Sequence, residues 1–117
     1  MQSLIKDINF AAEGRKKIDW VSNFMPTLNT LGDRFEAEQT FKGQTIVVSV
    51  HLEAKTAYLA TVLKRGGADV IVTGSNPLST QDDVAAGLVD MGLTVYAWYD
   101  CTEEEYFHFL NKALDHK

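Results

Sequence analysis

Three short, almost unbroken runs of apolar and β-branched residues constrain the fold more than any other feature of this sequence. They are TIVVSV at 45–50, ADVIVTG at 68–74 and LTVYAW at 93–98. Runs without polar alternation are typical of strands that are covered on both faces, as in a parallel sheet. Apolar residues with helical spacing follow each run, at 54–65, at about 80–91 and at 103–115. This β-α-β-α-β-α order predicts a three-layer, Rossmann-like α/β unit with a short parallel sheet.

Two further helical stretches precede the first strand, at 13–24 and 27–37. Pro26 is well placed to open the second one, because proline suits the first position of a helix. The apolar residues of both stretches could form one continuous stripe that covers the sheet or contacts another chain: Ile18, Val21, Met25, Leu28, Leu31 and Phe35. We therefore divide the chain into a helical lead-in at 1–42 and an α/β unit at 43–117.

Composition excludes several classes of protein. The 117 residues are 45% hydrophobic and 23% charged, which is typical of a single globular domain. The net charge is −5 and no basic patch occurs, so we expect no nucleic-acid partner. No apolar run approaches the roughly 20 residues of a membrane span, and the first residues lack the apolar block that is expected of a secretory signal. The lone Cys101 cannot form an internal disulfide, which predicts a reducing, cytoplasmic compartment.

Polar segments follow the first two strands. They are SVHLEAKT at 49–56 and TGSNPLSTQDD at 73–83. Ligands of open parallel sheets bind beyond the carboxyl ends of the strands, so these turns are expected side by side at one sheet edge. Convergent hydroxyl, amide, imidazole and charged groups over an apolar sheet are typical of a small-molecule pocket.

Structural explanations of the same residues stay open. Thr80 with an aspartate three residues later is also a helix-start signature, and residues 75–77 are also ordinary turn chemistry. His51 at a strand end can be a hydrogen-bonded structural histidine, and Glu53 can be a solvated side chain. Lys55 near a helix N-terminus opposes the macrodipole, which favours a functional role for it.

The motifs expected of a dinucleotide site, a metal site or a reactive thiol are absent from this sequence. No G-x-G-x-x-G follows a strand, so no dinucleotide site is expected in this chain. The histidines have no metal-ligand spacing with one another or with Cys101, so we expect no metal and an inert thiol. Thr102 and Glu105 form a capping box that predicts the start of the last helix.

Two long strings carry a family resemblance. VHLEAKTAYLATVLKRGGADV, followed by GSNPLSTQDDVAAGLVDMGLTVYAW, closely resembles the N-terminal, substrate-binding region of S-adenosylhomocysteine hydrolase. AAEGRKKIDWVSNFMPTL and EEEYFHFLNKALDH fit the same family, so the resemblance covers nearly the whole chain. The strings HLEAKT and NPLSTQDD look like its archaeal and thermophilic-bacterial branch.

The resemblance implies a function for the whole enzyme and roles for residues of this chain. Adenosylhomocysteinases reversibly hydrolyse S-adenosylhomocysteine to adenosine and homocysteine in the methyl cycle, and their bound NAD oxidises the ribose 3′-hydroxyl. The resemblance also implies that His51 is an acid/base participant near the ribose. The implied substrate-binding residues are Leu52, Glu53, Lys55, Thr56, Ser75, Asn76, Ser79, Thr80 and Gln81.

One departure from the better-known family pattern bears on the substrate. That pattern has threonine and glutamate where this chain has Glu53 and Lys55, and its glutamate accepts a hydrogen bond from the amine of adenine. Lysine only donates, so Lys55 would suit the carbonyl of hypoxanthine and S-inosylhomocysteine is an alternative substrate. Glu53 could instead accept from the amine and keep adenine. Ser75 also replaces a cysteine that is common in the better-known branch.

A second departure is length. The family's NAD domain and its further catalytic residues have no counterpart in these 117 residues, so we expect no NAD on this chain and no hydrolysis by it alone. A stand-alone nucleoside-binding module and an interaction module are the alternatives. We expect an open sheet edge beside the second or third strand, which predicts a homo-oligomer, or association with the missing C-terminal portion.

Overall fold

The computed structural model describes residues 3–74, 78 and 80–115, and its elements alternate as the sequence predicts. A short 3-10 helix, η1 (Ile8–Phe10), leads into α1 and α2. The remaining elements follow in the order strand, helix, strand, helix, strand, helix. Their bounds are α1 (Ala11–Ser22), α2 (Pro26–Glu38), β1 (Thr45–Ser49), α3 (Ala54–Arg65), β2 (Asp69–Thr73), α4 (Asp82–Asp90), β3 (Thr94–Tyr96) and α5 (Glu103–Asp115).

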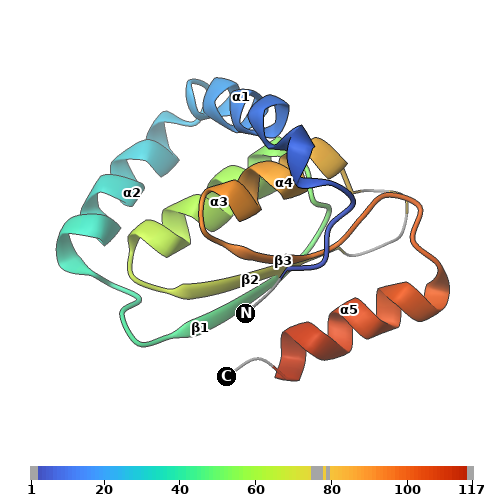
Figure 1. The fold of residues 1–117 in the computed structure, drawn as a ribbon. Coiled ribbons are helices and arrows are strands. Elements are labelled where there is room, and N and C mark those ends of the chain that lie inside the picture. The colour runs from blue at the N-terminus through green and yellow to red at the C-terminus, as the bar shows by residue number, and fades with distance from the viewer. Residues whose placement is uncertain (1–2, 75–77, 79, 116–117) are drawn as a thin grey trace.

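The three strands form a parallel sheet in the order β1-β2-β3. Ile71 at the centre of β2 pairs with Val47 of β1 and Thr94 of β3. Figure 1 shows α3 and α4 on one face of the sheet, with α1 above them, and α5 on the opposite face. The predicted three-layer α/β unit with a short parallel sheet is therefore confirmed.

Each face of the sheet has its own apolar cluster. The larger cluster joins the sheet to α1, α3 and α4, and Ile18, Val72, Leu88 and Val95 belong to it. The smaller cluster lies between the sheet and α5, where Phe109 meets the ring of Trp98 edge to face. Burial on both faces explains why the strand sequences lack polar alternation.

Glycines bring α1 and α4 into close contact. A Cβ at Gly14 would overlap the backbone carbonyl of Asp83, and a Cβ at Gly87 would lie 2.9 Å from the backbone nitrogen of Arg15. Only glycine allows two helix backbones to approach this closely without moving apart. α1 is therefore fixed over α4, including its first turn.

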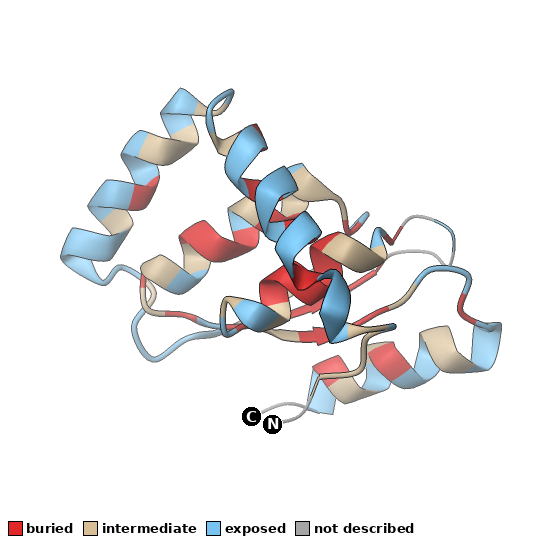
Figure 2. Ribbon diagram, turned by 45° about the horizontal axis from the view of Figure 1, so that its top comes forward, coloured by how far each residue is buried: buried red, intermediate tan, exposed pale blue. Residues whose placement is uncertain are grey.

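α2 is attached more loosely. Gly32 is its single buried residue, and Figure 2 shows most of this helix as exposed. Leu31 keeps 39% of its surface exposed, whereas Ile18 and Val21 on α1 are buried. The stripe predicted over both helices is thus covered along α1 and only partly covered along α2.

The edges of the sheet differ from the prediction. β2 is the central strand and has no open edge. Next to β3, Leu4 forms a parallel bridge with Tyr96, its backbone N–H donates to the carbonyl of Val95, and the Ser3 hydroxyl accepts from the N–H of Val95. The expectation of an open edge at the second or third strand is wrong, because the N-terminal segment covers β3. β1 forms the other edge, and β2 is its strand neighbour within the described part of the chain.

The two helix-start signatures have different outcomes. Glu105 accepts from the Thr102 N–H at 2.8 Å and donates its own N–H to the Thr102 hydroxyl at 3.1 Å, so the predicted capping box is confirmed. α4 begins at Asp82 with Gln81 as its N-cap, so Thr80 is not the capping residue. Within the described residues, no helix has the length and apolarity that crossing a membrane requires.

Candidate functional site

The turns that leave β1 and β2 meet at the carboxyl edge of the sheet. The backbone N–H of Gln81 donates to the carbonyl of Leu52 at 2.9 Å. The Ser49 hydroxyl donates to the carbonyl of Gly74 at 3.3 Å, which joins the same two segments nearer the strands. The expectation that the two polar turns lie side by side is therefore confirmed. Leu52 is fully buried in this junction, and Thr80 is 4% exposed.

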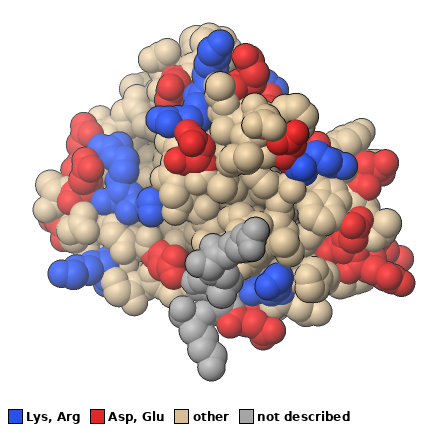
Figure 3. Space-filling view, viewed as in Figure 1, with Lys and Arg blue, Asp and Glu red and all other residues tan. Residues whose placement is uncertain are grey.

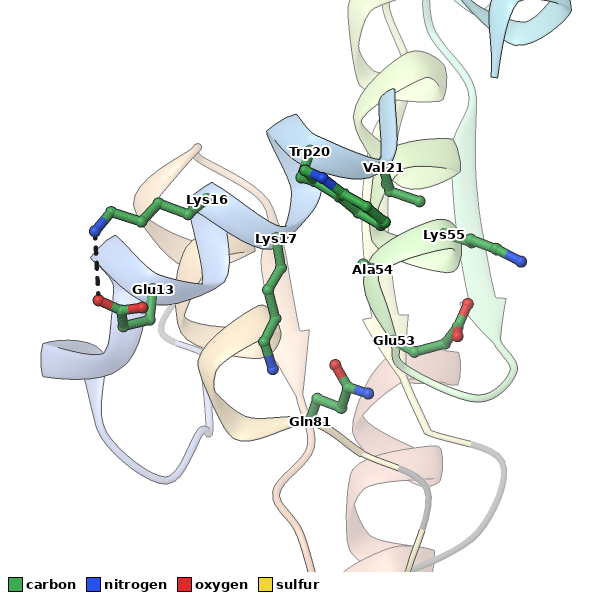
Figure 4. Close-up of a pocket in the computed structure, with 9 residues that line it drawn as sticks. All are labelled: Glu13, Lys16, Lys17, Trp20, Val21, Glu53, Ala54, Lys55 and Gln81. Atoms are coloured by element: carbon green, nitrogen blue, oxygen red, sulfur yellow. Dashed lines mark ion pairs between the residues drawn. The ribbon is translucent and has the colours of Figure 1, made fainter. Parts of the chain in front are cut away.

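A hollow of about 530 Å³ lies between this junction and α1. Figure 4 shows that α1 forms one wall and that the starts of α3 and α4 form the other. The residues that line the hollow are Glu13, Lys16, Lys17, Trp20, Val21, Glu53, Ala54, Lys55 and Gln81. Glu53, Lys55 and Gln81 are the site residues expected from sequence that the structure brings to this hollow.

A second, more apolar hollow of about 620 Å³ lies next to the first, between α2 and α3. Lys55 lines both hollows, and Thr56 lines the second. Phe24, Leu31 and Leu59 supply apolar surface to it while remaining at least 39% exposed. The first turn of α3 therefore separates a mixed polar hollow from an apolar one.

The remaining predicted residues lie elsewhere or cannot be described. His51 is exposed in the turn between β1 and α3, next to Leu52, and lines neither of these two hollows. The predicted residues Ser75, Asn76 and Ser79 lie outside the described part of the chain.

Sequence reasoning missed the wall that α1 contributes. Lys17 and Trp20 occupy exposed positions of an amphipathic helix, where charged and aromatic side chains are usually assigned to solvent. In the fold, Lys17 extends from α1 toward Gln81, as Figure 4 shows. Trp20 keeps 65% of its surface exposed and its ring lies 4.7 Å from that of Phe24. The signal that could have found them is that the family resemblance includes this segment.

Charges of both signs surround the first hollow. Lys17 forms an ion pair with Asp83 at 2.7 Å, and Lys16 pairs with Glu13 at 3.5 Å. On the face drawn in Figure 3, basic and acidic side chains are interspersed, with acidic ones gathered where α5 begins. No single sign of charge therefore dominates the surroundings of the first hollow.

Two other chemistries gain no support from the described residues. Burial raises the pKa of the Cys101 thiol, with a smaller contribution from nearby Glu105, so the reactive thiolate is disfavoured. Among the residues that the structure describes, no three His, Cys, Asp or Glu side chains are grouped to hold a metal ion.

Comparison with known proteins identifies the family. The family model described as S-adenosyl-L-homocysteine hydrolase matches residues 2–117. The chain belongs to this family. The S-adenosyl-L-homocysteine hydrolase resemblance noted in the sequence is thereby confirmed over nearly the whole chain.

Similar members of the family carry two different names. An S-inosyl-L-homocysteine hydrolase of Methanocaldococcus jannaschii is 55% identical over 113 residues, which are 97% of this chain and 27% of that protein. An adenosylhomocysteinase of Pyrococcus abyssi is 55% identical over 111 residues, which are 95% of this chain and 26% of that protein. An adenosylhomocysteinase of Thermotoga maritima is 51% identical over 104 residues, which are 89% and 26% of the two chains. The chain spans about a quarter of the length of the curated relatives it matches.

Proposed function

We propose that this chain forms the nucleoside-binding portion of an enzyme that hydrolyses S-adenosyl- or S-inosyl-L-homocysteine. The observation that carries this proposal is the backbone hydrogen bond between Gln81 and Leu52, which joins the two segments that the resemblance implicates. The hollow beside this bond has a volume of about 530 Å³, within the roughly 300–1,000 Å³ of small-molecule pockets.

The lining side chains supply complementary groups for a nucleoside. Gln81 carries both a donor and an acceptor, Glu53 accepts when ionised, and Lys55 donates. Trp20 presents an aromatic surface on the opposite wall. In the proposed complex these groups orient the base, and the sugar extends toward the turn that contains His51.

His51 is the proposed acid/base residue. Histidine is the side chain used most often for proton transfer at neutral pH, because its ordinary pKa lies near the working pH. His51 lies one residue before Leu52 and is exposed in this structure, and in the proposed complex the ligand extends beyond the hollow to meet it. Its role concerns the protons near the ribose 4′ and 5′ positions that the resemblance implies.

NAD does not fit the residues of this chain. The turn between β1 and α3 reads VHLE and contains no glycine, whereas a dinucleotide fingerprint needs glycines for the tight turn and the close pyrophosphate. We therefore assign no step of the reaction to a cofactor bound by these residues. We propose that NAD is held by polypeptide outside these 117 residues. We also propose that these residues alone do not complete the hydrolysis.

The recognised base follows from two of the charged residues that line the hollow, Glu53 and Lys55. Lys55 would donate to the carbonyl of hypoxanthine, whereas Glu53 would accept from the amine of adenine. Relatives of both names are about equally similar to this chain, so the comparisons leave both bases open. We propose hypoxanthine as the preferred base, because Lys55 replaces the glutamate that the resemblance associates with adenine.

The test is calorimetric titration of the chain with adenosine and with inosine. We expect inosine to bind more tightly, and Lys55→Glu to shift the preference toward adenosine by about tenfold, as one mispaired buried polar group costs about 1–3 kcal/mol. Lys64→Glu is the matched control, because it makes the same charge change near the other end of α3. A wild-type preference for adenosine would contradict the hypoxanthine proposal, and no heat with either nucleoside would contradict binding by this chain alone.

The exposed apolar side chains favour a second candidate, an interaction module. Trp20 and Phe24 each keep 65% of their surface exposed, Trp20 at the first hollow and Phe24 at the apolar hollow between α2 and α3. In this candidate the chain associates with copies of itself or with a separate C-terminal polypeptide. Adding the remaining length of the Pyrococcus abyssi relative in trans tests it, since regained hydrolysis would support assembly and light scattering would detect a homo-oligomer. The lone Cys101 supports a reducing, cytoplasmic setting for either candidate.

A further inference from the structure

One ion pair joins the wall of the first hollow to the start of α4. Lys17 extends from α1 and its ammonium lies 2.7 Å from the Asp83 carboxylate. The Asp83 side chain is only 22% exposed, and the Lys17 side chain is 49% exposed. Lys17 lines the hollow together with Gln81, and Figure 4 shows the two side chains approaching each other there.

Asp83 belongs to the turn that begins with Gln81. Gln81 is the N-cap of α4, and its carbonyl accepts the backbone N–H of Ala85 at 3.0 Å. Asp83 also accepts the backbone N–H of Val84 through its second carboxylate oxygen, at 2.8 Å. One helical turn before Lys17, Gly14 allows α1 to meet the backbone carbonyl of Asp83. α1 therefore holds the first turn of α4 at two neighbouring points.

We propose that Lys17 is a positioning residue for the nucleoside hollow. Its ion pair with Asp83 fixes the first turn of α4 and thereby sets where the Gln81 side chain stands in the hollow. Lys17 acts through Asp83 and makes no bond to the ligand. This inference rests on the proposed function, because Gln81 matters for binding only if the hollow takes a nucleoside.

The molecule contains a matched control. Arg15 on α1 and Asp90 on α4 form an ion pair at 2.9 Å, with exposed side-chain fractions of 50% and 48%. It joins the same two helices, but Asp90 ends α4, whereas Asp83 lies in its first turn. Neither Arg15 nor Asp90 lines the first hollow. Breaking this pair perturbs the α1–α4 contact without touching the turn that contains Gln81.

Nucleoside titration of variants separates positioning from direct contact. Lys17→Met and Asp83→Asn are each expected to weaken binding of the preferred nucleoside about fivefold. The double variant should bind no more weakly than either single variant. Asp83→Asn keeps an acceptor oxygen for the Val84 N–H, and Lys17→Arg should restore wild-type affinity. Arg15→Met and Asp90→Asn should leave affinity within twofold. Wild-type affinity in Asp83→Asn, or equal losses in the control pair, would overturn the inference.

A second readout does not need the ligand. In ligand-free protein, the backbone and side-chain amide resonances of Gln81 should shift in Lys17→Met and in Asp83→Asn, and return toward wild type in Lys17→Arg. They should stay in place in Arg15→Met. If wild-type protein binds neither nucleoside, the proposed function fails while these resonances still test the positioning. Unchanged Gln81 resonances in both pair variants would overturn it.

Discussion

Helices α1 and α2 have similar lengths and similar apolar spacing, yet they are held in different ways. α1 buries four of its twelve residues, including Gly14 and Ile18, whereas α2 buries one of thirteen, Gly32. α1 meets α4 backbone to backbone through glycines. α2 meets α3 through long polar side chains, such as the Tyr58 hydroxyl that donates to Asn29 and the Arg65 guanidinium that pairs with α2.

The difference teaches that helical periodicity identifies the face of a helix but not the distance at which it packs. That distance depends on the size of the residues at the crossing point. Close approach through glycine gives many contacts and little tolerance of change. Contact through long side chains tolerates change, because such side chains can move aside.

Paired glycine substitutions should show the largest difference between the two helices. Gly14→Ala would place a methyl group against the carbonyl of Asp83, so α1 and α4 must separate. We expect a loss of about 3 kcal/mol, near the upper end for overpacking. Gly32→Ala meets the flexible end of Arg65 at 2.8 Å and gains helix propensity, so its effect should stay within about 1 kcal/mol.

Urea denaturation monitored by circular dichroism measures both effects. Gly43→Ala serves as a control that measures backbone strain without a steric clash. Its φ is +83°, and nothing within 4 Å would meet the new methyl group. Equal free energies of unfolding for Gly14→Ala and Gly32→Ala would remove the proposed distinction between α1 and α2.

The attachment of α2 should also depend on salt. Arg65 at the end of α3 donates to Asp33 at 2.8 Å and to Glu36 at 3.1 Å, and the hydrogen bond with Asp33 is the main reason that the pKa of Arg65 is raised. Both acidic partners are more than half exposed, so Arg65→Met should lower the free energy of unfolding by only about 0.5–1 kcal/mol. The loss should shrink in 1 M NaCl because salt screens exposed pairs.

Arg34→Met is the control for this experiment. Arg34 pairs with Glu38 within α2 itself, so it does not join the helix to the rest of the fold. Parallel salt titrations of both variants, followed by thermal unfolding, give the comparison. A salt-independent loss in Arg65→Met would mean that Arg65 acts through the packing of its aliphatic chain.

The smallest expected effect comes from α5, which begins differently from both helices. α1 and α2 have Phe10 and Met25 as N-caps without side-chain capping bonds, whereas α5 has its capping box. The hydrogen bond from the Thr102 N–H lowers the pKa of Glu105 below its ordinary value of 4.5. Ionised Glu105 therefore stabilises the fold. Its contribution is complete above pH 4.5 and is lost as the pH falls through the lower folded-state pKa.

Glu105→Gln should remove this part of the acid dependence, because glutamine still accepts a hydrogen bond but does not ionise. Melting temperatures measured from pH 6 to pH 3 should fall less steeply in this variant than in wild type. Glu104→Gln, in the same helical turn, is the control. An identical slope in wild type and Glu105→Gln would show that the capping box has no part in the acid response.

The sequence predicted the sheet and its helices because burial on both faces leaves a strong local pattern. Ile71 and Val72 are fully buried, and the strand that contains them lies within the predicted run. The capping box is equally local, because Thr102 and Glu105 are only three residues apart. The bridge from Leu4 to β3 could not be predicted, because a single residue that pairs with a distant strand leaves no periodic signal.

The candidate site was predictable on one side only. Glu53, Lys55 and Gln81 follow strands, and the rule for parallel sheets is sufficient to bring their turns together. Lys17 and Trp20 form the opposite wall from an exposed helix face, and their place depends on how closely α1 crosses α4. That crossing is set by Gly14 and Gly87, whose partners are far apart in the sequence.

Leu4 and Ser3 also determine how this sheet can grow. They engage both backbone polar groups of Val95, so a further strand can join beside β1 but not directly beside β3. If two molecules paired through their β1 strands, each would cover the sheet edge at which a further strand can join. Such an assembly would close at two copies, whereas a sheet receptive on both flanks can recruit molecules without end and become a fibre.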